Sequence, residues 1–157
     1  MPLTHLPYNL PGKAYRSPMP FSAFDPYNEV FPAYLEQDIS TVVLFPDDAE
    51  CLVRSGRDLR KFYEQEGIQV LHLPTGDFHA PKIKALRQIV EEAYALLNKG
   101  NNIAVHCYAG IGRTGTFAAC LARRVFGFSG EMAIEWTRKI IPGAIEVEEQ
   151  AETVLIY

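Results

Sequence analysis

The sequence predicts an α/β protein with a central, mostly parallel twisted sheet of about four to five strands flanked by helices. Short, β-branched apolar segments alternate along the chain with longer segments whose apolar residues recur at helical spacing. A glycine-rich turn also lies between one such short segment and a long apolar one. Strand–turn–helix units of this kind are typical of parallel sheets.

The composition is that of an ordinary globular protein. The chain has 157 residues, 48% of them hydrophobic and 22% charged, so we expect one domain over residues 1–157. The proline- and aromatic-rich residues 1–32 are expected to pack on it. The formal net charge of −4 disfavours nucleic acid as a partner. No apolar run is long enough for a membrane span, and the N-terminus does not resemble a secretory signal.

The chain uses cysteine sparingly, at Cys51, Cys107 and Cys120. An odd number without a CxxC pair argues against a disulfide framework and against a zinc cluster. Such thiols suit a reducing compartment, which predicts a cytoplasmic protein. Cys120 is expected in the core, whereas Cys51 is either packed or a resolving thiol for oxidised Cys107.

Strands are predicted where short apolar segments end at a proline or follow a glycine and an asparagine. Prolines recur through residues 1–32 and exclude a long helix there. The segment ISTVVLF is β-branched and is stopped by Pro46, which is typical of a buried strand. The predicted strands cover residues 14–17, 39–45, 68–73 and 102–106.

Helices are predicted where apolar residues recur at a spacing of three or four. The clearest case is 81–99, which ends near Gly100. The other predicted helices cover 114–126, 130–140 and 147–157, with one inside 47–66 that begins after Gly56 and a short helix or turn inside 25–35.

The stretch VHCYAGIGRTGT, residues 105–116, places a cysteine and an arginine at the two ends of the glycine-rich turn. In parallel sheets, ligands bind at the carboxyl ends of the strands, where this turn lies. Its glycines allow successive N–H groups to point into one concavity, and Arg113 supplies a fork for two oxygens. The predicted cradle for a tetrahedral dianion consists of Tyr108, Ala109, Gly110, Ile111, Gly112 and Arg113.

Cys107 lies at the floor of this predicted cradle. Thiols at helix N-termini and beside cations lose their proton more readily than free cysteine does. We therefore predict that Cys107 attacks phosphorus while Arg113 and the backbone N–H groups hold the equatorial oxygens. Thr114 is expected to donate a hydrogen bond to the sulfur, and His106 to order the loop through its ring N–H groups.

The leaving oxygen of a phosphate ester also needs a proton. Asp77 lies in the loop 74–81, which follows a strand and should reach the same edge of the sheet. We predict Asp77 as the general acid and later as the general base, with a plain turn or capping role as its alternative. Asp47 and Asp48 also follow a strand but rank lower, because they resemble the opening of a helical region.

The segment HCYAGIGRTGT resembles the HCxxGxxR(S/T) signature of the cysteine-dependent protein tyrosine phosphatases, and the short chain resembles their compact dual-specificity members. YRSPMP at 15–20 is similar to the N-terminal strand motif of those members, and IPGAIEVEEQ at 141–150 resembles their (R)PGxIEtxxQ segment. The resemblance implies a phosphatase-type cysteine loop, a phosphocysteine intermediate, hydrolysis by water, and neither a metal nor another cofactor. It also maps Gln150 onto a glutamine that orients this water.

Three departures leave the substrate preference open. Ile141 stands where arginine is common, and Tyr108 replaces the serine or lysine often found after the cysteine. The loop that carries Asp77 lacks the tryptophan of the large tyrosine-specific enzymes.

The expected function is therefore hydrolysis of phosphotyrosine in proteins or peptides, with phosphoserine and phosphothreonine as further substrates and phosphate-like oxyanions as inhibitors. Inositol phosphates and phosphoinositides are the alternative substrates. The uncharged side chains in the cysteine loop disfavour them, whereas a basic rim would favour them; its members would be Arg123, Arg124, Arg138 and Lys139. A non-catalytic phosphopeptide-binding module is disfavoured because the cysteine, the arginine and the acid are all present.

Overall fold

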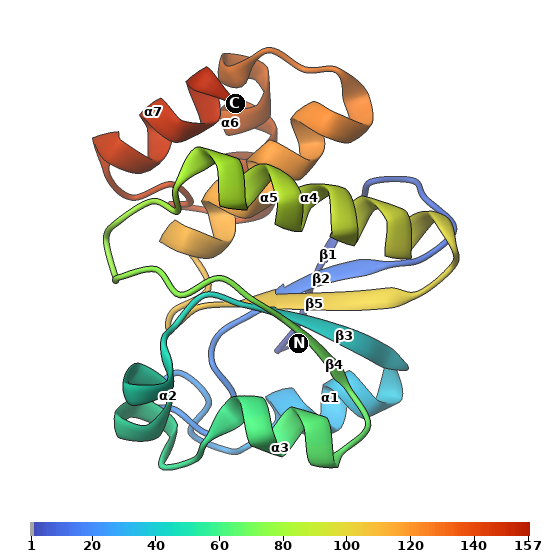
Figure 1. Cartoon of the computed structure of the whole chain (residues 1–157), viewed down its shortest axis with the longest axis vertical. Helices are drawn as coiled ribbons and strands as arrows, with labels where there is room; N and C mark the ends of the chain where they lie inside the picture. The colour runs from blue at the N-terminus through green and yellow to red at the C-terminus, as the bar shows by residue number, and fades with distance from the viewer. Residues whose placement is uncertain (1) are drawn as a thin grey trace.

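In the computed structural model, which describes residues 2–157, a five-stranded sheet separates two layers of helices (Figure 1). The strand order is β1-β2-β5-β3-β4, and β2, β5, β3 and β4 run parallel. The predicted α/β class and mostly parallel sheet are confirmed. The strands are β1 Thr4–Leu6, β2 Ala14–Ser17, β3 Ile39–Leu44, β4 Gln69–His72 and β5 Asn102–His106.

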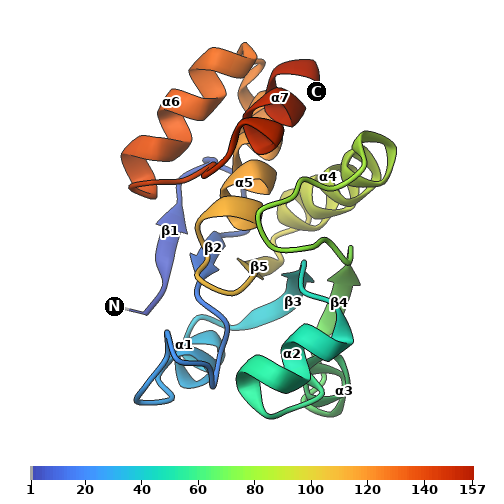
Figure 2. The ribbon, with the colours of Figure 1, turned by 90° about the vertical axis from the view of Figure 1, so that its left-hand side faces the viewer.

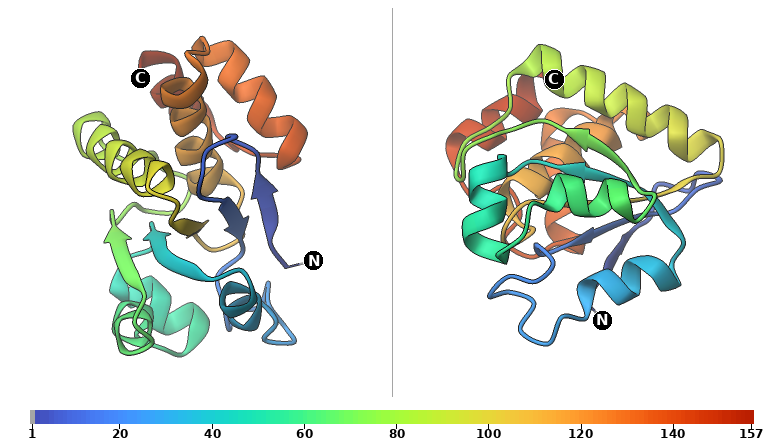
Figure 3. Two further views of the ribbon diagram at one scale, coloured as in Figure 1. Left: turned by 90° about the vertical axis from the view of Figure 1, so that its right-hand side faces the viewer. Right: turned by 60° about the horizontal axis from the view of Figure 1, so that its bottom comes forward.

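The N-terminal segment contributes two strands, one more than the sequence predicted. β1 pairs antiparallel with β2 at the edge of the sheet, where the hairpin is seen in blue in Figure 3. The prediction missed β1 because its three residues between prolines are too short to show an alternating pattern. Prolines next to it are tolerated because an edge strand has one side without a partner strand.

The helices lie on opposite faces of the sheet (Figures 1 and 2). One face is covered by α1 Val30–Glu36, α2 Asp48–Ser55 and α3 Leu59–Gln65. The other face is covered by α4 Ile83–Asn98, α5 Gly112–Phe126, α6 Gly130–Ile140 and α7 Glu148–Ile156. Among residues 2–157, no helix is long and apolar enough to cross a membrane.

The helix predicted after Gly56 is confirmed as α3, but the segment 47–66 also forms α2, which the sequence did not predict. Asp47 begins α2 by accepting a hydrogen bond from the Glu50 backbone N–H at 2.7 Å. Gly56 ends α2 in the left-handed conformation, with a φ of 73°. Asp58 then begins α3 by accepting a hydrogen bond from the backbone N–H of Lys61 at 3.3 Å.

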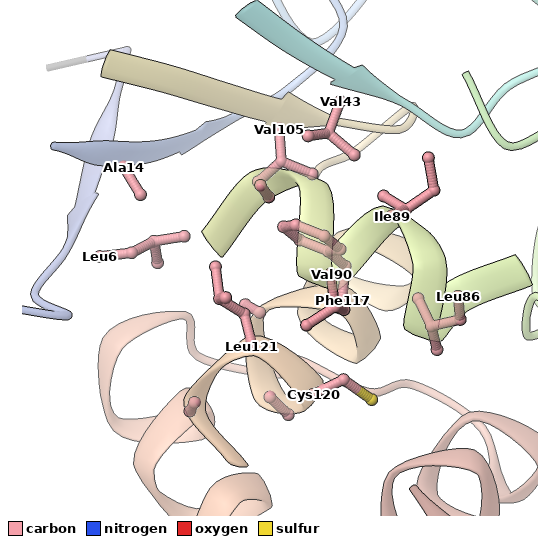
Figure 4. Close-up of a cluster of buried hydrophobic side chains, with 14 of the residues drawn as sticks. Leu6, Ala14, Val43, Leu86, Ile89, Val90, Val105, Phe117, Cys120 and Leu121 are labelled. Atoms are coloured by element: carbon pink, nitrogen blue, oxygen red, sulfur yellow. The ribbon is translucent and has the colours of Figure 1, made fainter. Parts of the chain in front are cut away.

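Side chains on the two faces of the sheet pack into two separate hydrophobic cores. Val43 and Val105 point toward α4 and α5 and pack in one cluster with Val90 and Phe117 (Figure 4). Their neighbours along the strands belong to the other cluster, on the side of α1 and α3. This alternation follows from the two-residue period of a strand and anchors each central strand in both cores.

The carboxyl ends of the parallel strands meet at one edge of the sheet. Figure 2 shows this edge, where α2, the loop before α4 and the loop before α5 lie side by side. Each of these segments follows directly on a parallel strand. The fold therefore brings three connections that are far apart in the sequence to one place.

Candidate active site

The cysteine loop, residues 107–113, joins β5 to α5. The helix begins at Gly112, two residues before the predicted start, so Arg113 lies in its first turn. The backbone N–H groups of residues 108–113 donate to no acceptor within residues 2–157. Backbone N–H groups gathered in one loop at a helix N-terminus form a receptor for an anion.

The backbone of the loop requires glycine at position 110. Gly110 has a φ of 79°, a region that disfavours other residues. A Cβ atom there would lie 2.4 Å from the carbonyl oxygen of Ser17 and 2.3 Å from Nη2 of Arg16. Both distances are much shorter than a van der Waals contact, so any residue with a Cβ atom at position 110 would displace the loop.

Cys107 lies in a cleft of about 340 Å³ at this edge of the sheet. Its side chain is almost buried, with 3% of the residue exposed. The Thr114 hydroxyl donates to its Sγ at 3.2 Å, as the sequence predicted. The cleft is lined by Phe24, Arg54, Asp77, Phe78, Cys107, Tyr108, Ala109 and Glu146. A larger hollow of about 520 Å³ beside α6 contains none of the predicted catalytic or phosphate-binding residues, although Arg138 and Lys139 line it.

His106 is buried beneath the loop and is neutral. Its Nδ1 lies 2.9 Å from the carbonyl oxygen of Cys107, which can only accept, so Nδ1 carries the proton. Its Nε2 therefore accepts from the Tyr63 hydroxyl at 2.8 Å. Burial lowers the pKa of His106 to about 4. This geometry fits the predicted ordering role, with one ring N–H in place of two.

Arg113 is buried and lies among acceptors. Both of its terminal nitrogens donate to the carboxylate of Glu50 at 2.8 Å, and Nη1 also donates to the Thr75 carbonyl at 2.9 Å. Burial lowers the pKa of Arg113, but Glu50 and the nearby Cys107 outweigh this and raise it. Among residues 2–157, Arg113 Nε is the single buried side-chain nitrogen or oxygen without a hydrogen-bond partner.

Sequence reasoning missed Glu50 and Arg54, both on α2. Glu50 pairs with Arg113, and Arg54 forms an ion pair with Glu50 at 3.2 Å. The guanidinium carbon of Arg54 lies 3.8 Å from the centre of the Tyr108 ring, which places Arg54 at the wall of the cleft. The sequence signal that could have indicated Glu50 is the acidic run that follows β3. β3 ends at the same edge of the sheet at which the cysteine loop begins.

Asp77 lies at the cleft between two arginines. Its Oδ1 is 3.3 Å from Arg113 Nη2, and its Oδ2 is 3.3 Å from Arg54 Nη1. The two rival carboxylates are held elsewhere, since Asp47 caps α2 and Asp48 makes a two-pronged ion pair with Arg60 at 2.6 and 2.7 Å. Of the three, only Asp77 lines the cleft with Cys107 in the described part of the chain.

Gln150 is fully buried and ties two segments of the site together. Its Nε2 donates to the carbonyl of His79 at 3.1 Å, and its Oε1 accepts from the Glu146 backbone N–H at 2.9 Å. Glu149 adds a second tie by accepting from His79 Nδ1 at 3.0 Å. These contacts hold the loop of Asp77 against the start of α7, while the water-orienting role of Gln150 stays a prediction.

The predicted basic rim is wrong, because its four members lie away from the cleft. Arg123 and Arg138 donate to backbone carbonyls near the C-terminal ends of their helices. Arg124 pairs with Glu91, and Lys139 with Glu135. Carboxylates of α4 and α6, together with carbonyls of α7 and of the segments after α5 and α6, engage these cations instead.

The two remaining cysteines do not line the cleft. Cys51 and Cys120 are buried and unpaired. Burial raises the pKa of each thiol to about 12, and for Cys51 the carboxylate of Glu50 adds to this. A thiol in that state is a poor nucleophile at neutral pH, which favours packing over the resolving role for Cys51.

Comparison with known proteins gives matches across this site. Residues 21–125 match the family described as "Polymorphic toxin system, DSP-PTPase phosphatase". The tyrosine-protein phosphatase CDC14 of Saccharomyces cerevisiae is 31% identical over 122 residues, which cover 75% of this chain but 22% of that protein. The chain therefore spans about a fifth of that relative.

Solved structures that share the fold include two that cover nearly the whole chain. The kinase associated phosphatase with its catalytic-site cysteine replaced by serine superposes with a TM-score of 0.85 at 24% identity, covering 97% of this chain and 90% of that one. The active form of Tk-PTP superposes with a TM-score of 0.77 at 28% identity, covering 96% of this chain and 93% of that one.

Proposed function

Because this chain belongs to the DSP-PTPase phosphatase family, we propose that it hydrolyses phosphotyrosine in proteins or peptides, and phosphoserine or phosphothreonine as well, through a phosphocysteine intermediate. One observation supports this proposal most strongly. The unpaired N–H groups of residues 108–113 and the unpaired Nε of Arg113 surround the same short loop as Cys107. Buried donors are costly unless a ligand accepts from them, and a phosphoryl group offers several acceptor oxygens.

In the first step, Cys107 Sγ forms a bond to phosphorus as the ester P–O bond breaks. The charge that develops on the equatorial oxygens is stabilised by the loop N–H groups and by Arg113, whose orientation Glu50 holds. Asp77, in its protonated form, gives its proton to the leaving oxygen. The carboxyl group lies at the cleft in the structure, within reach of a bound ester.

In the second step, water attacks phosphorus and the P–S bond breaks. Asp77, now a carboxylate, takes a proton from the water, and the sulfur leaves as a thiolate. The Thr114 hydroxyl, 3.2 Å from Sγ, stabilises this thiolate by donating to it. Gln150 keeps the loop of Asp77 in place throughout.

The cleft wall favours a phosphorylated aromatic side chain over an inositol phosphate. Phe24 and Phe78 are more than half exposed there, and the Phe24 ring meets Tyr108 edge-on at 4.7 Å between ring centres. Polyphosphates need several cations at the mouth of a site, whereas Arg54 is the one cation among the residues that line this cleft.

We also infer a reducing, cytoplasmic location. All three cysteines are unpaired, and the proposed nucleophile is a thiol that oxidation would inactivate. Phosphate-like oxyanions should act as competitive inhibitors, since they fill the same cradle as the phosphoryl group.

Turnover of p-nitrophenyl phosphate by purified variants tests this function. Cys107→Ser should abolish turnover and retain binding of tungstate, and Asp77→Ala should lower kcat by about a hundredfold or more. Asp47→Asn is the matched control and should leave kcat nearly unchanged, because Asp47 caps α2 outside the cleft. Undiminished hydrolysis by Cys107→Ser would refute the proposal. A panel of phosphopeptides and inositol phosphates then ranks the substrates.

A further inference from the structure

We propose that Arg16 is a positioning residue for the oxyanion site: its guanidinium clamps two successive carbonyls of the cysteine loop and so turns the loop N–H groups toward the bound phosphoryl group. This inference rests on the proposed function of the loop. It concerns a residue of β2, on a segment remote in sequence from the loop that it holds.

The clamp consists of two short hydrogen bonds. Arg16 Nη2 donates to the carbonyl oxygen of Ala109 at 2.9 Å, and Arg16 Nε donates to that of Gly110 at 3.0 Å. The N–H and C=O groups of one planar trans peptide point in opposite directions. Drawing these two carbonyls toward β2 therefore turns the N–H groups of Gly110 and Ile111 the other way.

Those two N–H groups belong to the set without a protein acceptor in residues 2–157. A loop whose N–H groups converge with no ligand bound pays an electrostatic cost, since like partial charges face one another. A fixed cation on the carbonyl side offsets that cost and keeps the loop in the binding-competent shape. The loop thus needs no reorganisation when the anion arrives.

The chain is built to keep Arg16 in this position. β2 is held between β1 and β5, and Arg16 lies in register with Val105 of β5, two residues before Cys107. Its Nη1 approaches the Thr4 hydroxyl of β1 at 3.5 Å. Gly110 leaves the space that the guanidinium fills, because a Cβ there would lie 2.3 Å from Arg16 Nη2.

Electrostatics point the same way. Burial lowers the pKa of Arg16, whereas Cys107 acts to raise it, so the guanidinium and the sulfur lie within each other's field. No carboxylate within the described residues makes an ion pair with Arg16. Its positive charge is therefore directed at the loop and its thiol.

Isothermal titration of the whole chain with tungstate tests the clamp without relying on turnover. Arg16→Gln should weaken tungstate binding by about tenfold to a hundredfold, the loss expected for hydrogen bonds from a charged donor. Arg16→Lys keeps the charge but cannot bind both carbonyls in a fork. Its tungstate affinity should therefore lie between that of the unmodified chain and that of Arg16→Gln. The same order should appear in the inhibition constant of tungstate against p-nitrophenyl phosphate.

Arg123→Gln is the matched control. Arg123 also donates to backbone carbonyls, those of Phe128 and Val154 at 3.0 and 2.9 Å, but at the far end of α5. It should lower the melting temperature and leave tungstate affinity within about twofold of the unmodified chain. Equal tungstate affinity in Arg16→Gln and the unmodified chain would overturn the clamp, as would full affinity in Arg16→Lys. If the unmodified chain itself neither binds tungstate nor hydrolyses the ester, the proposed function fails instead.

Discussion

Arg113 shows how single residues set up this site. Its charge is buried, so it needs a partner, and Glu50 provides one while leaving Nε free. The same pairing fixes the plane of the guanidinium, which decides where two of its donors can point. Asp77 completes the group by lying between Arg113 and Arg54, so the proposed acid and the proposed anion receptor share one charge network.

Glu50→Gln should reduce kcat/KM for an aryl phosphate by about tenfold to a hundredfold. The amide of glutamine has one oxygen to accept from Arg113, and its NH2 group would face the second terminal nitrogen of Arg113, which is also a donor. Steady-state kinetics measures this, with thermal melting run alongside. Asp48→Asn is the control, since it removes an exposed pair with Arg60 outside the cleft. Equal losses in the two variants would show that Glu50 does not orient Arg113.

His106 should make stability depend on pH. Its pKa is lowered from 6.5 to about 4 by burial. Between pH 6.5 and pH 4, the unfolded chain therefore binds a proton on His106 that the folded chain does not bind. The contribution of neutral His106 to the free energy of unfolding is fully present above pH 6.5. It is lost as the pH falls toward 4, and the total loss is about 3 kcal/mol.

Urea unfolding between pH 7 and pH 4.5 measures this loss. His106→Asn should be less stable at pH 7, and its free energy of unfolding should fall less steeply with acid. Parallel pH curves for the two proteins would mean that folding does not lower the pKa of His106, which would contradict this prediction.

The elements supply the site through the ends of parallel strands. The segment after β2 brings Phe24, α2 after β3 brings Glu50 and Arg54, and the loops after β4 and β5 bring Asp77 and Cys107. A strand–helix pattern predicts such a meeting point but not its members. α2 was not predicted because it is short, with eight residues, of which Cys51 alone is buried.

Gly110→Ala should abolish oxyanion binding while the protein stays folded. The added Cβ would collide with the Ser17 carbonyl and with Arg16, and its φ of 79° is strained for alanine. Tungstate titration and circular dichroism check this. Gly127→Ala is the control, because Gly127 has a φ of 70° and open space around its would-be Cβ. That variant should lose about 1 kcal/mol of stability and keep tungstate affinity; unaltered tungstate binding in Gly110→Ala would contradict the loop geometry.

The whole molecule explains which parts of the site were predictable. Cys107, Arg113 and Thr114 lie in one contiguous motif, so their spacing alone indicated a cradle around a thiol. Arg16 and Glu50 contact that motif from segments far away in the sequence. A single sequence does not show which distant cations and carboxylates meet in the fold. The long elements were predicted because burial imposes a period on their apolar residues, whereas β1, with three residues, and α2, with eight, are too short for such a pattern to stand out.

Ligand binding should stabilise the entire chain. Tungstate at a hundred times its dissociation constant should add about 2.7 kcal/mol to the free energy of unfolding. Cys107→Ser should keep this gain and Arg113→Ala should lose it, because the arginine holds the oxygens. Thermal melting with and without tungstate measures both, and an equal gain in Arg113→Ala would place the ligand elsewhere.

The most direct measurement is the capture of the covalent intermediate in Asp77→Ala. p-Nitrophenolate leaves readily without a proton, whereas attack by water still needs the base, so the second step becomes slow in this variant. Denaturing quench within the first turnovers, followed by peptide mapping by mass spectrometry, should find one phosphoryl group per chain on the sulfur of Cys107. A phosphoryl group on any other residue, or steady turnover with Cys107 never modified, would contradict the account.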